Sequence, residues 1–151
     1  MKTQNESAEI LNDLVQINND RIEGYEKAIE NLKEEDIDLK PLFVSLIGES
    51  QKCRMALSTE LNVLKTNTEQ TSSTSGHLHR AWMDVKAVFT GHDRKSLLEN
   101  CEFGEDAAQK AYKDAANEEN LPAHLKQMIL EQKNALKESH DKIKHLRDQQ
   151  V

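Results

Sequence analysis

Apolar residues recur every three or four positions along four long stretches of the chain, with polar residues between them. This spacing places the apolar residues on one side of an α-helix, which must then be buried against other helices. The pattern predicts long helices over residues 5–33, 38–65, 93–116 and 121–148. Asn18 interrupts the stripe of the first helix, as does Arg21, and the break indicates either a buried polar layer or a local edge of the core.

The segment between the second and third predicted helices has a different composition. Residues 67–76 contain no apolar side chain and are typical of an exposed linker. A short amphipathic helix over residues 77–89 is predicted to follow, and its apolar face has to dock on another apolar surface. That face consists of Leu78, Ala81, Trp82, Val85, Val88 and Phe89.

The lengths of the connections predict how the helices are arranged. The first two long helices are joined by only a few residues, as are the last two, so each pair forms an antiparallel hairpin. About 27 residues separate the hairpins, which is enough to cross the bundle from end to end. We therefore predict a single all-α domain over residues 1–151, a ferritin-like antiparallel four-helix bundle whose long crossover carries the short extra helix. An up-down-up-down bundle with a decorated loop is the alternative.

The composition narrows the class of protein further. The chain has 20 Lys and Arg against 27 Asp and Glu, a formal charge of −7, and only five Gly and two Pro among 151 residues. So few glycines and prolines argue against a loop-rich β-sandwich or barrel, and the acidic excess argues against nucleic acid as a partner. The sequence shows no run of about 18 apolar residues and no apolar leader, so we expect a cytoplasmic protein that binds no membrane.

A ferritin-like bundle raises the question of a di-metal site. Such a site takes one Glu from each of two helices and a Glu-x-x-His motif from each of the other two, because a spacing of three residues points both ligands inward. None of the six histidines has a glutamate three positions before it. The usual ligand set for two iron or manganese ions is therefore absent, and no cofactor is expected.

A reduced metal site can still be drawn from polar residues near the inner faces of the helices. Glu60, Glu105 and His140 come from three different helices and could together hold one iron or manganese ion. Glu105 is expected to point inward because it shares the apolar stripe of Cys101. The alternative is that these groups pair with basic side chains, as semi-buried charges in bundles usually do. The basic candidates are Arg21, Arg54 and Lys142.

The short predicted helix carries the cluster His79-Arg80-x-Trp82, which combines basic and aromatic side chains. One interpretation is a docking surface for a protein partner. The other is that Trp82 anchors the short helix while Arg80 reaches a carboxylate of the bundle.

Several short strings occur in an order that resembles a known family. They are Gly24-Tyr25-x-x-Ala28, Glu60-Leu61, Leu78-His79-Arg80-x-Trp82, Glu102-x-Gly104-Glu105-Asp106 with Tyr112, Leu121-Pro122 and His140-Asp141-x-Ile143-x-x-Leu146-Arg147. Together, from about Ser7 to Arg147, they resemble a bacterial family of ferritin-like four-helix-bundle proteins described only as a domain of unknown function. The resemblance implies a ferritin-like bundle without an established activity. The residues that it marks as structural anchors or site residues are Tyr25, Glu60, Glu105, Tyr112 and His140.

These observations leave three functional interpretations open. The first is a non-enzymatic, cytoplasmic, stress-related structural or interaction module that self-associates as a homodimer and has an unidentified protein partner. The alternative is a divergent metal-binding protein, or a di-metal carboxylate oxidase, that uses the reduced set Glu60, Glu105 and His140. Partner binding through the Trp82 helix is a third interpretation.

Overall fold

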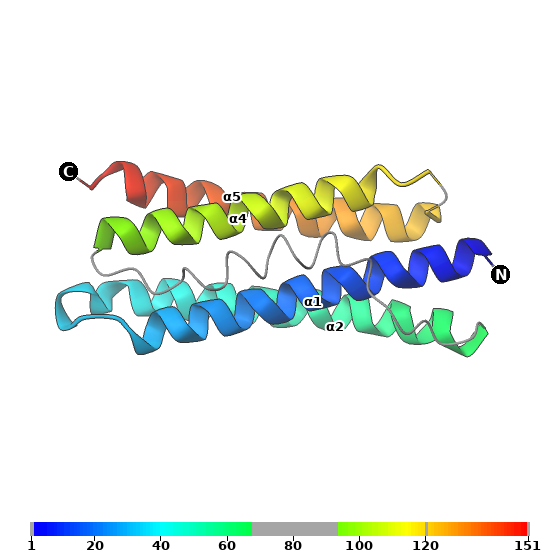
Figure 1. Cartoon of the computed structure of the whole chain (residues 1–151), viewed down its shortest axis with the longest axis horizontal. Helices are drawn as coiled ribbons and strands as arrows, with labels where there is room; N and C mark the ends of the chain where they lie inside the picture. Colours follow the sequence, from blue (N-terminus) through cyan, green and yellow to red (C-terminus); the bar gives the residue numbers. More distant parts are fainter. Residues whose placement is uncertain (1, 68–93, 120, 151) are drawn as a thin grey trace.

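The computed structural model describes residues 2–67, 94–119 and 121–150. These residues form four long α-helices and one short 3₁₀-helix, and none of them lies in a β-strand. The prediction of an all-helical bundle is therefore confirmed (Figure 1). The elements are α1 (Lys2–Glu30), η1 (Glu34–Leu39), α2 (Lys40–Asn67), α4 (Arg94–Ala116) and α5 (Ala123–Asp148).

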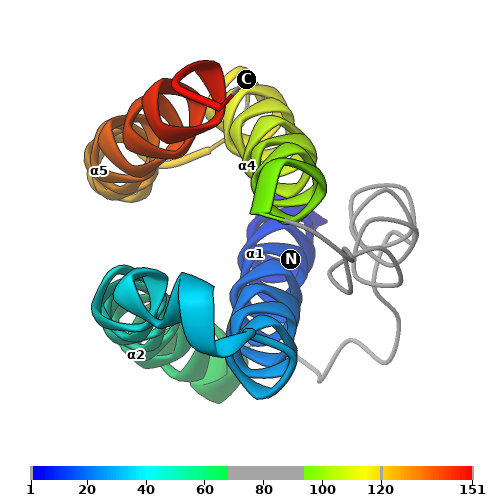
Figure 2. The same cartoon turned by 90° about the vertical axis from the view of Figure 1, so that its left-hand side faces the viewer.

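The four helices are arranged as two hairpins. In the first, α1 packs along α2, and in the second, α4 packs along α5, while contacts between α1 and α4 join the two hairpins (Figure 2). The fourth pair of neighbouring helices, α2 and α5, makes few contacts. Arg94 at the start of α4 pairs with Asp38 in η1, with 2.8 Å between Nη1 and Oδ1. The helices α2 and α4 therefore begin at the same end of the bundle and run in the same direction (Figure 1).

One continuous core runs through the bundle, because the apolar stripes of all four helices meet along its axis. Burying a side chain of the size of leucine or tyrosine contributes about 1.5–3 kcal/mol, so these contacts are the main stabilisation of the fold. The largest fully buried apolar and aromatic side chains are Tyr25, Tyr112, Phe43, Leu11, Leu14, Ile17, Leu57, Leu98 and Leu125.

The connection between α1 and α2 contains a short helix that was not predicted from the sequence. Glu34–Leu39 form a 3₁₀-helix, so α2 begins at Lys40 instead of residue 38. The reason is burial, since Leu39 joins the core and the buried Asp36 lies 3.4 Å from Arg94. The first helix also differs from its predicted bounds, because it spans Lys2–Glu30 instead of residues 5–33.

Two further sequence predictions concern the short helix and the membrane. The short helix predicted over residues 77–89, with His79, Arg80 and Trp82, lies outside the described residues, so both interpretations of that cluster stay predictions. Among the helices that the structure describes, none has a stretch apolar and long enough to pass through a bilayer.

Replacing Gly48 with alanine is expected to raise the free energy of unfolding by about 0.5–1 kcal/mol. Gly48 lies inside α2 and is exposed, and a Cβ atom there would meet nothing within 4 Å. The added methyl group therefore restricts the unfolded chain without a clash in the folded one. Urea unfolding monitored by circular dichroism measures the change, and a loss of stability would contradict the open space described at this position.

Candidate functional site

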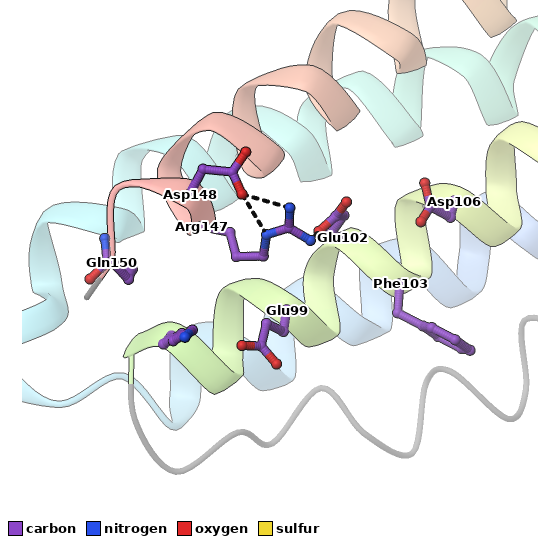
Figure 3. A pocket seen from close by; sticks show the side chains of 8 residues that line it. Glu99, Glu102, Phe103, Asp106, Arg147, Asp148 and Gln150 are labelled. Carbon is purple, nitrogen blue, oxygen red and sulfur yellow. Dashed lines mark hydrogen bonds and ion pairs between the residues drawn. The ribbon is translucent and has the colours of Figure 1, made fainter.

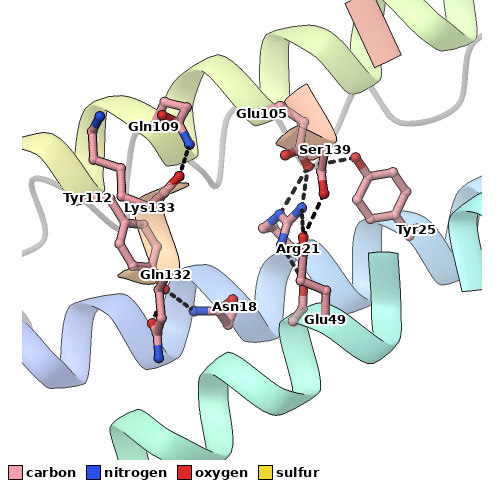
Figure 4. Close-up of polar contacts among 11 residues, drawn as sticks. Asn18, Arg21, Tyr25, Glu49, Glu105, Gln109, Tyr112, Gln132, Lys133 and Ser139 are labelled. Atoms are coloured by element: carbon pink, nitrogen blue, oxygen red, sulfur yellow. Dashed lines mark hydrogen bonds and ion pairs between the residues drawn. The ribbon is translucent and has the colours of Figure 1, made fainter. Parts of the chain in front are cut away.

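A buried ion pair lies at the centre of the bundle. The side chain of Arg21 in α1 is 0% exposed, as is that of Glu105 in α4. Arg21 donates from Nε (3.0 Å) and from Nη2 (2.6 Å) to Oε1 of Glu105, and the hydroxyl of Tyr25 donates to the same oxygen at 2.7 Å (Figure 4). The inward position predicted for Glu105 is confirmed, and so is the alternative in which a basic side chain neutralises it.

The other two helices complete this layer. From α2, Ser50 accepts a hydrogen bond from Nη1 of Arg21 at 2.7 Å, and Glu49 lies 3.5 Å from Nη2 of Arg21. From α5, Ser139 donates to Oε1 of Glu49 at 2.8 Å (Figure 4). We call Arg21, Tyr25, Glu49, Glu105 and Ser139, together with Ser50, the arginine layer. Its ionisable groups are one guanidinium and two carboxyls, besides the phenol.

The electrostatics of the arginine layer follow from its burial. Burial is the largest effect on the pKa of Arg21 and lowers it, but the charge of Glu105, its hydrogen bonds with Arg21, and the nearby Tyr25 and Glu49 together outweigh burial and hold the pKa above its usual value. Burial raises the pKa of Tyr25, and the charge of Glu105 raises it further, so the phenol stays protonated and donates. Burial also raises the pKa of Glu49, although the charge of Arg21 opposes the rise. The layer thus contains a permanent positive charge.

A second polar layer crosses the bundle about two turns along α4. Asn18 donates to the hydroxyl of Tyr112 at 2.9 Å, and that hydroxyl donates to Oε1 of Gln132 at 2.7 Å (Figure 4). Gln132 in turn donates to the backbone oxygen of Cys53 at 3.3 Å. Burial raises the pKa of Tyr112, so its hydroxyl keeps its proton. We call these four residues the tyrosine layer, and they link all four helices in one chain of hydrogen bonds.

Both cysteines are free and buried. Burial raises the pKa of Cys53 to about 11. Burial also raises the pKa of Cys101 well above its usual value, and the charge of Glu105 adds to the rise. Since the thiolate is the reactive form of cysteine, neither thiol is activated as a nucleophile at neutral pH.

The structure does not bring the three predicted metal ligands together. Glu60 lies near the surface, where its Oε1 is 3.2 Å from Nε2 of His124. Glu105 lies in the arginine layer, paired with Arg21. His140 instead contacts two aspartates, Asp106 on α4 and Asp141 next to it on α5. The reason is that helical spacing predicts which face a residue occupies, but it does not predict its height along the bundle.

A cluster of two carboxylates and a histidine between α4 and the C-terminal half of α5, which we call the histidine cluster, was not predicted as a unit. One ligand atom from each of Glu102, Asp106 and His140 lies within 4.8 Å of the others. Glu102 also pairs with Arg147, beside a cavity of about 480 Å³ whose acidic and basic lining is drawn in Figure 3. Partial burial lowers the pKa of His140, but its bond to Asp141 and the charge of Asp106 outweigh this effect and raise the pKa. The sequence signal was the spacing of four between the two α4 carboxylates, which places them on one face.

An open groove runs between α2 and α5, where these two helices touch only lightly. Its larger part has a volume of about 610 Å³ and is lined by Gly48, Glu49 and Cys53 from α2 and by Met128 and Gln132 from α5, among others. A smaller part of about 260 Å³ continues it past Glu49 toward Ser139. We call this feature the α2–α5 groove. Both polar layers therefore reach its floor.

Comparison with curated proteins and with solved structures gives no match. A family model does match, over residues 6–119, and its description is "Domain of unknown function (DUF2383)". This match confirms the part of the predicted resemblance that concerns a domain of unknown function. Because it covers well over half of the chain, the chain belongs to the DUF2383 family.

Proposed function

We propose that this chain is a non-enzymatic structural or interaction module with ferritin-like connectivity, in which a guanidinium stands where bundles of that kind hold metal ions. The connectivity is supported by the common direction of α2 and α4, since α2 ends and α4 begins at opposite ends of the bundle (Figure 1). The cytoplasmic location, the homodimer and the stress-related role belong to the same proposal.

The observation that carries this proposal is the pairing of Arg21 with Glu105. Glu105 is fully buried at the centre of the bundle, and two guanidinium nitrogens hold its Oε1. A divalent cation placed about 4 Å from the guanidinium would be repelled by about 8 kcal/mol at an effective dielectric constant of about 20. The layer therefore favours an internal ion pair over a metal, and it supports a structural role for its carboxylates.

Elemental analysis tests the proposal directly. Protein expressed with iron and manganese supplied is expected to contain well below one ion of either metal per chain, because Arg21 competes for Glu105. A content of about two ions per chain, lost in Glu105→Gln but kept in Glu118→Gln, would overturn the proposal. Glu118 is an exposed residue after α4, so its variant has the same change in charge without touching the layer.

A second candidate function, the binding of one divalent cation, is favoured by the histidine cluster of Glu102, Asp106 and His140. Two carboxylates and an imidazole are suitable ligands for zinc or manganese. Asp141 lies 3.0 Å from Nδ1 of His140, which is the outer-shell partner that metal-binding histidines usually have. The pairing of Glu102 with Arg147 opposes this function, because it places a positive charge beside the ligands.

A separate metal-binding measurement distinguishes the two candidates. For the second candidate, equilibrium dialysis against zinc or manganese should give one ion per chain, and His140→Ala should abolish it. His124→Ala is the matched control, since His124 is an exposed histidine on the same helix and contacts Glu60 instead of the histidine cluster. Metal-free protein under these conditions would remove the second candidate and leave the first.

A further inference from the structure

The α2–α5 groove is the one long side of the bundle that its own described helices do not close. Its two parts share Ser45 and Glu49, so they form one continuous depression. On α2 it extends from Leu42 to Ala56, a length of about 21 Å at 1.5 Å per residue. Its walls are two antiparallel helices, since Glu49 on α2 lies opposite Ser139 on α5 and Cys53 lies opposite Gln132 (Figures 2 and 4).

The walls of the larger part combine small and flexible apolar side chains. Gly48, Cys53 and Ala56 line it from α2, and Ala135 lines it from α5. Small side chains let a third helix approach closely, and the flexible side chain of Met128 can adjust to different partners. This part of the groove therefore fits the apolar face of a helix.

The charge at the floor of the groove is unbalanced. Glu49 and Glu105 share one guanidinium, that of Arg21, so the arginine layer carries one excess negative charge when both carboxyls are ionised. Glu105 is fully buried, whereas the side chain of Glu49 is 25% exposed and lines both parts of the groove. The exposed charges along the rim cancel one another, because two are basic and two are acidic. They are Lys52, Lys142, Glu131 and Glu138.

We propose that the α2–α5 groove binds an amphipathic helix of a partner protein, which lays its apolar face on Cys53, Ala56 and Ala135 and places a lysine or arginine against Glu49. A groove of this length between two helices matches helix-in-groove recognition, in which apolar anchors give affinity. The cation neutralises the excess charge of the arginine layer. The inference rests on the proposed function, since it gives the interaction module the chemistry of its partner.

A helical peptide provides the probe. A stapled, fluorescently labelled peptide of about fifteen residues, with a leucine and alanine face and one central lysine, is titrated with the full-length protein. We expect saturable binding that Gly48→Trp abolishes, because its side chain fills the groove from a position with open space around the Cβ. Met55→Trp is the matched control and should keep the affinity, because Met55 is exposed on the same helix and lines neither part of the groove. Circular dichroism checks that each variant is folded.

A second set of variants tests whether Glu49 binds a cation of the peptide. Glu49→Gln keeps an acceptor for Ser139 and is expected to weaken binding roughly tenfold, the loss of about one charge-assisted hydrogen bond. Glu118→Gln, with the same change in net charge, should leave the affinity unchanged. A peptide in which methionine replaces the lysine should bind the native protein and Glu49→Gln equally well, since it offers no cation.

Three outcomes would overturn the inference. They are an absence of peptide binding, binding that Gly48→Trp does not change, and a protein dimer that Gly48→Trp dissociates, which would assign the groove to a second copy of the chain. None of them alters the metal content, so failure of this inference leaves the proposed function standing. Conversely, a di-metal centre with intact peptide binding would overturn the proposed function alone.

Discussion

Replacing Arg21 with methionine is expected to lower the free energy of unfolding by about 3–5 kcal/mol. Glu105 would then be a fully buried carboxylate without its cation, and Ser50 would lose its donor. Methionine fills much of the space of the aliphatic part of the arginine side chain. The loss in free energy of unfolding therefore reflects the missing charge and its hydrogen bonds more than a cavity. Urea unfolding of the purified variant at neutral pH measures it.

The double variant Arg21→Met with Glu105→Gln separates the ion pair from general packing. It removes both charges, while the amide oxygen at position 105 can still accept from the hydroxyl of Tyr25. We expect it to be more stable than Arg21→Met alone, because replacing both members of a buried ion pair is often close to neutral. Arg54→Ala is the control, since Arg54 is only partly buried and bonds to Asn19, and it should cost less than about 1 kcal/mol. An equally small cost for Arg21→Met would contradict the role given to the ion pair.

Replacing Tyr112 with phenylalanine is expected to cost about 1–3 kcal/mol, because it leaves a buried acceptor without a donor. The hydroxyl of Tyr112 donates to Gln132 and accepts from Asn18. Asn18 keeps a second acceptor, the backbone oxygen of Leu14 at 2.9 Å, so the loss falls mainly on Gln132. The ring itself stays, and the core therefore keeps its packing.

Thermal and urea unfolding of Tyr112→Phe measure this loss. Phe103→Leu is the control on the same helix, since the side chain of Phe103 is 60% exposed, and its change should stay within about 0.5 kcal/mol. If Tyr112→Phe were as stable as the native protein, the tyrosine layer would not be a constraint on the position of α5, and the shape of the α2–α5 groove would have to depend on other contacts.

The two polar layers link the four helices, including α2 and α5 on either side of the groove. Each layer uses hydrogen bonds from all four helices, and such bonds hold helices at one height and one rotation, whereas apolar contacts tolerate small shifts. The hydrogen bond of Ser139 to Glu49 and that of Gln132 to Cys53 join α5 to α2, although these two helices make few other contacts. The same polar groups that link the helices at the centre therefore also line the groove.

Much of the fold was predictable from the sequence for a simple reason. A stripe of apolar residues with helical spacing is buried only if the segment is a helix packed on others, so the four long helices and the inward position of Glu105 follow from periodicity. The interruption of the first stripe by Asn18 and Arg21 indicated a polar layer or an edge of the core, and the structure shows the layer. The absence of a Glu-x-x-His motif is likewise a property of the sequence alone.

Only the tertiary structure decided which polar side chains of different helices contact one another. Periodicity gives the face of each helix that turns inward, but the height of one helix against another depends on packing between residues far apart in the chain. For this reason the pairing of Arg21 with Glu105, 84 positions away, could be offered only as an alternative. The grouping of His140 with Glu102 and Asp106, instead of Glu60 and Glu105, was missed for the same reason. The open side between α2 and α5 depends on the relative rotation of the two hairpins, which no local pattern contains.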